Sequence, residues 1–354
     1  MEKNKIQSWK MTELNSEFKL TESDFPELNE NEVIIKIAGC GVCHTDLSFW
    51  HFGVKTKHEL PLTLGHEISG KIIAGPNHLL NKKVIIPAVL PCGECELCKG
   101  GRGNICQNQL MPGNDFDGGF ASHIKVPHKN LCYVPECLLD KYRLADLSVV
   151  ADAITTPYQV LKKSELKEGD FAICIGVGGV GIYGALLAKI MGAKVLAIDI
   201  ADSKLHLAKE HGIDAVLNVS GLDPREVKQK VREIAKELKV SRYGWKILEM
   251  SGTVQGQELG YALITFASTM SIVGFTMEKP NVRLSNLMAF DAKLIGTWGC
   301  KPELYNDVLD FIDQEKLKIG DFIETFPMSE INEVFKNTLD HKYTKRSVLV
   351  PDFE

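Results

Sequence analysis

The pattern of hydrophobic and polar positions changes once along the chain, near residue 170. From residue 31 to about 150, short hydrophobic runs of strand length are separated by Gly, Pro and Asn, which is typical of a β-rich region. After residue 170, strand-length runs alternate with helix-length segments, which predicts right-handed βαβ units on a parallel sheet. The strands predicted in the first region are 33–37, 68–73, 83–87 and 120–126.

The second region begins with a predicted strand at 171–175, a glycine turn, a helix that runs to residue 191 and a strand at 194–198. A charged helix at 224–239 has Pro224 in its first turn and Asp223 as its cap, and its polar pattern predicts a face in solvent. The remaining predicted strands are 247–250, 270–275, 293–296 and 347–350, and the remaining helices are 303–315 and 329–339.

Length and charge narrow the class of protein. A chain of 354 residues with 44% hydrophobic and 25% charged residues predicts a folded protein of two domains. A net charge of -5 argues against nucleic acid as a partner. The segment 1–11 has no apolar core of a signal peptide, and no apolar run reaches about 18 residues. We therefore expect a soluble, cytoplasmic protein with no membrane partner.

Ten cysteines are the unusual feature of the composition, and four of them lie within fifteen residues. In a reducing compartment, clustered cysteines are more often metal ligands than disulfide partners. Gaps of two residues let successive sulfurs turn back onto one ion, and Zn²⁺ binds four thiolates in a tetrahedron. We predict a structural zinc site, with free cysteines in a loop as the alternative. The four ligands are Cys92, Cys95, Cys98 and Cys106.

A second candidate metal site comprises Cys43 and His66, each close in sequence to a carboxylate, Asp46 and Glu67. One Cys and one His from separate loops suit a catalytic zinc that keeps a coordination position for water or substrate. Each motif alone is weak. The Gly-His-Glu segment can be incidental, and Cys40 with Cys43 can instead form a zinc pair or a redox dithiol.

A glycine-rich turn lies between the predicted strand at 171–175 and the helix that follows. Gly176, Gly178 and Gly181 match the GxGxxG pattern, and Asp199 ends the next strand 23 residues after Gly176. Such a turn lets the backbone approach a pyrophosphate, while the carboxylate binds ribose hydroxyls. Because that carboxylate repels a 2′-phosphate, we predict NAD rather than NADP. Zinc and a dinucleotide together indicate hydride transfer from an alcohol carbon to nicotinamide.

The order of these motifs resembles that of the zinc-dependent medium-chain alcohol dehydrogenases, from about residue 34 to the C-terminus. The segment 39–46 carries the most specific match. The resemblance implies an α/β fold with a GroES-like β-barrel catalytic domain at 1–154 and 297–354. It also implies a Rossmann domain with a doubly wound parallel sheet at 155–296, which binds NAD, and two zinc ions per chain.

The same resemblance assigns the catalytic metal ligands. It selects Cys43 rather than Cys40, and it places the third ligand at Asp152, where many members have Cys. A carboxylate oxygen is an acceptable zinc ligand, and it makes the ion a harder Lewis acid. The alternative is that Asp152 caps the following helix. Glu67 resembles a residue that approaches the metal transiently, and Asp46 would orient His66.

Roles in proton transfer and cofactor binding are also implied. Thr45 would take the alcohol proton and pass it through the cofactor ribose. Many relatives have His three residues later, where this chain has Ser48, and His51 or His44 can substitute. A His51 that is merely buried or exposed is the alternative. The implied cofactor-binding residues are His44, Gly176, Gly178, Gly179, Val180, Gly181, Asp199, Lys204, Ser251, Val273 and Gly274. For Lys204 the alternative is a solvated helix position.

Longer segments resemble one branch of the family, the 6-hydroxycyclohex-1-ene-1-carbonyl-CoA dehydrogenases of anaerobic benzoyl-CoA degradation. This branch oxidises a ring hydroxyl of a CoA thioester to the 6-oxo compound. No Lys or Arg cluster in the sequence indicates where CoA would bind. The segments are 61–70, 111–114, 148–153, 244–247, 287–292, 296–300, 327–335 and 351–353.

Two alternatives to this function remain. The first is a zinc dehydrogenase for another cyclic or aliphatic secondary alcohol. The second, of another class, is a non-catalytic zinc or nucleotide-binding regulator, although such a protein needs no open metal site. The resemblance also implies a homo-oligomer, either a dimer or a tetramer, in which the last strands of the Rossmann sheet often pair.

Overall fold

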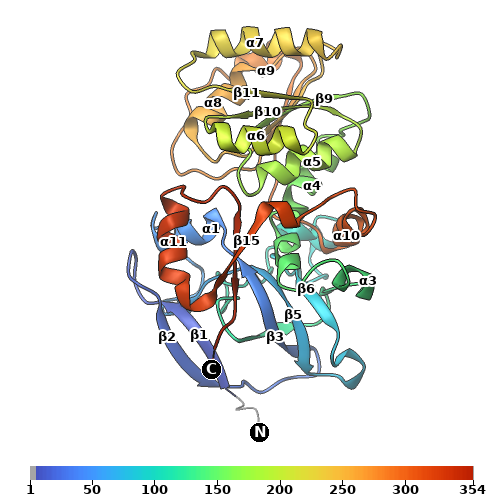
Figure 1. Ribbon diagram of the computed structural model, residues 1–354. Coiled ribbons are helices and arrows are strands. Elements are labelled where there is room, and N and C mark those ends of the chain that lie inside the picture. The colour runs from blue at the N-terminus through green and yellow to red at the C-terminus, as the bar shows by residue number, and fades with distance from the viewer. Residues whose placement is uncertain (1–4, 354) are drawn as a thin grey trace. The chain divides into compact units, whose positions relative to one another are not determined.

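The computed structural model describes residues 5–353 and divides into two compact units (Figure 1). Unit 1 contains the chain up to Thr155 together with the stretch from Gly299 onward. Unit 2 is the continuous segment Thr156–Trp298. Unit 1 is therefore made of two segments that are separated in the sequence by all of unit 2. Residues 1–4, which are part of the segment 1–11 that has no apolar core of a signal peptide, lie outside the described residues.

Unit 1 is built on a seven-stranded sheet in which β15, β16, β3, β5, β6 and β8 follow one another and β7 pairs with β3. A three-stranded sheet has the order β2-β1-β4. The strands are β1 (Lys5–Met11), β2 (Lys19–Asp24), β3 (Glu32–Gly41), β4 (Leu62–Thr63), β5 (Glu67–Ala74), β6 (Lys83–Ile86), β7 (His123–Pro127), β8 (Cys132–Tyr133), β15 (Ile323–Pro327) and β16 (Arg346–Val350).

The helices of unit 1 are short. The α-helices are α1 (His44–Trp50), α2 (Glu96–Lys99), α3 (Glu136–Leu139), α10 (Tyr305–Asp313) and α11 (Ile331–Leu339). The 3-10 helices are η1 (Asn77–Leu79), η2 (Gly103–Ile105), η3 (Asp146–Ala151), η4 (Pro302–Leu304), η5 (Gly320–Phe322) and η6 (Met328–Glu330).

The register of β3 places the chain's C-terminal strand beside the loop that carries Cys43. β3 pairs antiparallel with β5, and β16 pairs antiparallel with the end of β3 through Val348 opposite Gly41. Apolar side chains of β3 and β5 enter a shared core with α11, including Ile35, Ile68 and Phe335, which are all fully buried. This core gives the loops after β3 and before β5 a rigid support.

Unit 2 is a six-stranded parallel sheet with the order β11-β10-β9-β12-β13-β14. The first strand, β9, lies in the middle of the sheet, with β10 and β11 on one side and β12, β13 and β14 on the other. Figure 1 shows α5 and α6 on one face of the sheet and α7 on the other. The strands are β9 (Phe171–Ile175), β10 (Lys194–Asp199), β11 (Ala215–Asn218), β12 (Lys246–Glu249), β13 (Thr269–Ile272) and β14 (Lys293–Gly296). The helices are α4 (Thr155–Lys163), which begins at the boundary, α5 (Gly181–Ile190), α6 (Asp202–Glu210), α7 (Pro224–Glu237), α8 (Val254–Ala262) and α9 (Ser285–Phe290).

The α/β class predicted from the sequence is confirmed, with a parallel sheet in unit 2 and a β-rich unit 1. The strand predicted at 270–275 is too long, because β13 ends at Ile272. The next two N–H groups, of Val273 and Gly274, both donate to the carbonyl of Glu249. β7 starts at His123 rather than at 120. β1 and β2 precede the region predicted to be β-rich, and β2 is nearly all exposed, so it has no alternating pattern.

Among the described residues, every helix is too short or too polar to span a bilayer.

Candidate functional site

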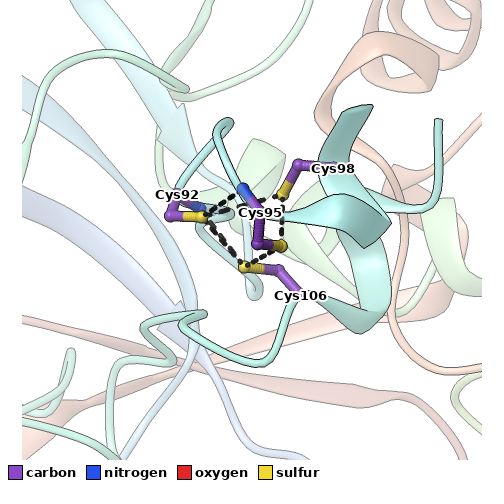
Figure 2. A group of neighbouring side chains, drawn as sticks. All are labelled: Cys92, Cys95, Cys98 and Cys106. Atoms are coloured by element: carbon purple, nitrogen blue, oxygen red, sulfur yellow. Dashed lines mark hydrogen bonds between the residues drawn. The ribbon is translucent and has the colours of Figure 1, made fainter. Parts of the chain in front are cut away.

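The four cysteines predicted as structural ligands converge in the loop that contains α2 and η2 (Figure 2). Their Sγ atoms are 3.5 Å apart for Cys95 and Cys98, 3.6 Å for Cys95 and Cys106, and 3.5 Å for Cys106 and Cys92. Four sulfurs at about 2.3 Å from one zinc ion are separated by roughly 3.8 Å in a tetrahedron. The arrangement therefore fits a closed tetrahedral metal site.

Backbone geometry prepares Cys92 to bind a metal as a thiolate. Its Sγ accepts hydrogen bonds from the N–H groups of Glu94 and Cys95, each at 3.4 Å. These bonds lower the pKa of Cys92 to about 6. The turn that brings the two N–H groups back to the sulfur requires a φ of +81° at Gly93, which a residue with a Cβ adopts only with strain.

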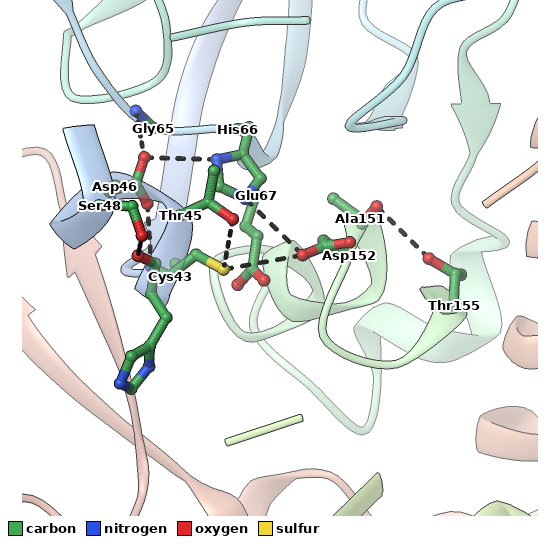
Figure 3. Close-up of polar contacts among 12 residues, drawn as sticks. Cys43, Thr45, Asp46, Ser48, Gly65, His66, Glu67, Ala151, Asp152 and Thr155 are labelled. Atoms are coloured by element: carbon green, nitrogen blue, oxygen red, sulfur yellow. Dashed lines mark hydrogen bonds and ion pairs between the residues drawn. The ribbon is translucent and has the colours of Figure 1, made fainter. Parts of the chain in front are cut away.

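A second cluster brings Cys43, His66, Glu67 and Asp152 together, with one ligand atom of each lying within 4.8 Å of the others (Figure 3). Asp152 Oδ2 lies 3.7 Å from His66 Nε2 and 3.8 Å from Cys43 Sγ. Three ligand atoms at about 2.0 to 2.3 Å from one ion have separations of this size. Nitrogen, sulfur and oxygen donors of this kind suit zinc, so the residues fit the ion that the sequence predicts.

Three separate segments of the chain supply this cluster, and Glu67, the first residue of β5, is the direct neighbour of His66. Cys43 is the N-cap of α1, directly after β3. His66 precedes β5, and Asp152 follows η3. Figure 3 shows these side chains directed toward one another. Asp152, the residue for which helix capping was the alternative, thus faces the sulfur and the imidazole.

Asp46 fixes the orientation of His66 from the side away from the cluster. Its Oδ1 lies 3.3 Å from His66 Nδ1 and accepts the N–H of Gly65, while its Oδ2 accepts the N–H of Cys43. Burial alone lowers the pKa of His66, but the carboxylates of Asp46 and Asp152 outweigh burial and raise it well above its usual value. The carboxylates around His66 therefore favour positive charge at this position.

Glu67 is paired with Arg346 at the start of β16, a residue that no sequence pattern selects. Arg346 Nε donates to Glu67 Oε2 at 3.1 Å, and Arg346 Nη2 donates to Glu67 Oε1. Both side chains are buried. Burial raises the pKa of Glu67, and the guanidinium opposes that rise. Nothing in the sequence distinguishes Arg346 from the neighbouring Lys345.

The predicted relay residues lie on or next to α1 in different settings. Thr45 Oγ1 lies 3.7 Å from Cys43 Sγ, at the edge of the cluster. The hydroxyl of Ser48 donates to the carbonyl of His44 at 2.8 Å, within the helix. His51 Nδ1 contacts Asn15 Oδ1 at 2.5 Å. The structure thus brings Thr45 to the metal residues and gives Ser48 and His51 other hydrogen-bond partners.

The glycine turn of unit 2 is closely packed at two of its glycines. A Cβ at Gly176 would lie 2.6 Å from the backbone nitrogen of Ser251, and one at Gly181 would lie 1.8 Å from the carbonyl oxygen of Gly176. Gly178 is open, with only Lys204 Nζ nearby. The N-terminus of α5 begins at Gly181, directly after the turn. A close backbone approach and a free helix N-terminus are the features that bind phosphates.

Asp199 supports this turn from the end of β10. Its Oδ2 accepts the N–H of Val177 at 2.9 Å, and its Oδ1 accepts the N–H groups of Ile200 and Ala201. The carboxylate predicted to bind the ribose therefore also shapes the loop around it.

Glu249, which the sequence did not single out, organises the two loops that carry Ser251, Val273 and Gly274. Its Oε1 accepts the N–H of Ser251 at 2.8 Å and the hydroxyl of Ser251 at 2.5 Å. Its main-chain carbonyl accepts the N–H groups of Val273 and Gly274. The sequence signal that could have identified Glu249 is its position at the end of a buried strand.

Two protein families match the chain. The alcohol dehydrogenase GroES-like domain matches residues 29–136, and the zinc-binding dehydrogenase domain matches residues 179–314. An alcohol dehydrogenase of Geobacillus stearothermophilus is 31% identical over 351 residues, which are 96% of this chain and 97% of that protein.

Solved structures of two dehydrogenases are similar to this chain over nearly its whole length. Galactitol-1-phosphate dehydrogenase from Escherichia coli superposes with a TM-score of 0.87 and 25% identity, covering 98% of this chain and all of that one. An alcohol dehydrogenase from Aeropyrum pernix superposes with a TM-score of 0.85 and 26% identity over the same shares.

Proposed function

Because the chain belongs to the zinc-dependent medium-chain alcohol dehydrogenase family and is an enzyme that acts on CH–OH groups, we propose that it oxidises a secondary alcohol with NAD and two zinc ions. The observation that carries this proposal is the cluster of Cys43, His66 and Asp152 with the Thr45 hydroxyl at its edge. The second zinc is assigned to the four cysteines of Figure 2.

The chain's own side chains then have defined tasks. A zinc ion held by Cys43, His66 and Asp152 would supply a Lewis acid for the alcohol oxygen. Thr45 Oγ1 would accept the proton of the alcohol hydroxyl while it passes its own hydroxyl proton on to the cofactor ribose, and Asp46 keeps the Nε2 atom of His66 directed at the ligand position. Arg346 balances the buried charge of Glu67.

We assign catalysis to unit 1 and all of the proposed cofactor contacts except His44 to unit 2. The close-packed Gly176 and Gly181 and the N-terminus of α5 would hold the pyrophosphate, and Asp199 would bind the adenosine ribose. The negative charge of Asp199 supports NAD over NADP. The other proposed contacts are His44, Gly178, Gly179, Val180, Lys204, Ser251, Val273 and Gly274.

For the substrate, we propose the ring hydroxyl of 6-hydroxycyclohex-1-ene-1-carbonyl-CoA, which is oxidised to the 6-oxo compound. Support for this choice is the similarity of the longer sequence segments to that branch of the family. Conjugation of the new ketone with the ring alkene favours the oxidation. Another cyclic or aliphatic secondary alcohol, or a polyol, is the competing substrate class.

The test is formation of NADH by the full-length protein with the thioester, cyclohexanol, short aliphatic alcohols and galactitol 1-phosphate. We expect kcat/KM for the thioester to exceed that for the free alcohols by about 100-fold or more, since a site built for polar groups discriminates strongly. A higher kcat/KM for a free alcohol than for the thioester would overturn the proposed substrate and leave the proposed dehydrogenase activity in place. Two bound zinc ions without oxidation of any of these alcohols would favour a regulator.

We also propose a homo-oligomer. β14 is the last strand of the unit 2 sheet, and one of its side chains, Leu294, is 42% exposed. Further exposed apolar side chains lie in the neighbouring loops and α9: Phe275, Met277, Leu284 and Met288. Within residues 5–353, no strand pairs with the outer edge of β14, and an open edge flanked by apolar side chains supports pairing with a second copy.

A further inference from the structure

Among the three proposed ligands of the catalytic metal, Asp152 is the most exposed. Cys43 is the N-cap of α1, and His66 is held between β5 and Asp46. Asp152 follows the last turn of η3 with φ at −145° and ψ at −55°. Its side chain is 16% exposed, against 2% for His66. The direction in which this carboxylate leaves the backbone therefore depends on the peptide before it.

That peptide is held through the carbonyl oxygen of Ala151. The N–H of Ala88 and the hydroxyl of Thr155 each donate to this oxygen at 3.4 Å, a long distance for a hydrogen bond (Figure 3 shows the Thr155 contact). The hydroxyl of Tyr305 donates to the same oxygen and is the closest of the three donors. Tyr305 is therefore the main anchor of the Ala151–Asp152 peptide.

Tyr305 is itself rigidly placed. It is the first residue of α10, its side chain is fully buried, and it is 154 residues from Ala151 in the sequence. A buried phenol hydroxyl needs a partner, because leaving a buried donor unpaired costs about 1–3 kcal/mol. The carbonyl of Ala151 meets that need, so the hydroxyl and the peptide fix each other.

We propose that Tyr305 is a positioning residue for the catalytic metal, through the carbonyl of Ala151 and the peptide that carries Asp152. This inference rests on the metal role proposed above for Cys43, His66 and Asp152. The hydroxyl of Tyr305 is bonded to the carbonyl of Ala151, so this role is exerted through the backbone next to Asp152. Residues that orient metal ligands from outside the ligand sphere typically change metal affinity by about 10- to 100-fold when they are lost.

The test is Tyr305→Phe in the full-length protein, which removes one hydroxyl and keeps the buried ring. Zinc at the catalytic cluster is removed with a mild chelator and replaced by titration with Co²⁺, and visible absorption reports the affinity and the ligand geometry. We expect the cobalt affinity of the variant to fall about 10- to 100-fold and the absorption bands to shift. Zinc bound by the four cysteines should stay at one per chain.

The matched control is Tyr261→Phe. Tyr261 is a buried tyrosine of unit 2 whose hydroxyl donates to the carbonyl of Arg283 at 2.8 Å, so this variant loses a bond of the same kind. We expect its cobalt affinity and spectrum to match those of the wild type. If Tyr305→Phe does not fold, Thr155→Val removes a longer bond to the same carbonyl and should lower cobalt affinity several-fold.

The possible outcomes are distinct. The positioning role alone is overturned if the wild type binds a metal at both sites and Tyr305→Phe has the same cobalt affinity as the wild type. If Tyr305→Phe fails to fold, an unchanged cobalt affinity in Thr155→Val has the same meaning. A wild type that binds metal only at the four cysteines overturns the proposed catalytic metal and this inference with it.

Discussion

At the scale of single residues, the catalytic cluster differs from the four-cysteine site in its donor atoms. It offers one sulfur, one nitrogen and a carboxylate oxygen, supplied by Cys43, His66 and Asp152. A carboxylate donates less charge to the zinc ion than a thiolate does, because it is the harder donor, so the ion stays a stronger Lewis acid. The identity of residue 152 thus bears directly on how strongly a bound zinc polarises the alcohol.

Replacement of Asp152 tests that role. We expect Asp152→Asn to lose the catalytic metal and to reduce kcat/KM about 100-fold or more, because a neutral amide is a poor zinc ligand. Asp152→Cys should keep two metals per chain. Elemental analysis and NADH formation measure both effects. Asp115→Asn removes a buried carboxylate of unit 1 outside the cluster and should leave two metals bound. Two metals in Asp152→Asn would contradict the assignment.

Asp199 decides the cofactor prediction. In Asp199→Gly we expect the affinity for NAD to fall about 10- to 100-fold, since hydrogen bonds to a charged group contribute about 1.5–3 kcal/mol, and the affinity for NADP to rise. Asp199→Asn keeps an acceptor for the N–H of Val177 and serves as the control for loop geometry. Fluorescence titration with NADH and NADPH measures both. Unchanged NADH binding with no gain for NADPH would refute the role.

At the scale of elements, the start of α7 follows directly from the sequence. Asp223 accepts the N–H groups of Arg225 and Glu226, and Glu226 accepts the N–H of Asp223 in return. These backbone donors lower the pKa of Asp223 below its usual value. A lowered pKa means that the cap stabilises the fold above the usual pKa of Asp and stops doing so as the pH falls through the lowered value.

We therefore expect Asp223→Ala to lower the Tm at pH 7 by about 2 °C and Asp223→Ser, which keeps an acceptor, to lower it less. The difference between the wild type and the Ala variant should shrink as the medium is acidified below about pH 4. Thermal unfolding followed by circular dichroism across this pH range is the measurement. A difference that grows on acidification would show that the carboxylate does not act as a cap.

The local pattern of apolar residues predicted individual strands and helices. It did not predict contacts between residues that are far apart in the sequence. β9 is a continuous apolar run that is buried on both faces, so its bounds could be read from the sequence. Cys92 and Cys95 lie together because their spacing is local. Arg346 and Tyr305 meet their partners only through tertiary folding. The helical periodicity of α10 places Tyr305 on its buried face, but it does not indicate which carbonyl the hydroxyl binds.

At the scale of the whole molecule, β14 and its apolar surroundings are the surface on which the proposed oligomer depends. We expect Leu294→Lys to shift the protein to a smaller assembly, because a charge on an open strand edge opposes pairing. Leu20→Lys changes a similarly exposed leucine on β2 and should leave the assembly unchanged. Light scattering after gel filtration gives the mass. A wild-type monomer, or an unaltered mass for Leu294→Lys, would contradict the proposal.

The division of unit 1 into two segments sets an order for events during protein synthesis. As the chain leaves the ribosome, Glu67 and Ala151 emerge long before Arg346 and Tyr305, with all of unit 2 made in between. The nascent first segment lacks β16 and the partners of two buried polar groups, whereas unit 2 is continuous and complete when residue 298 has emerged. Translation thus favours a fold in which the second unit matures first, and the metal-binding unit closes only at the final strand.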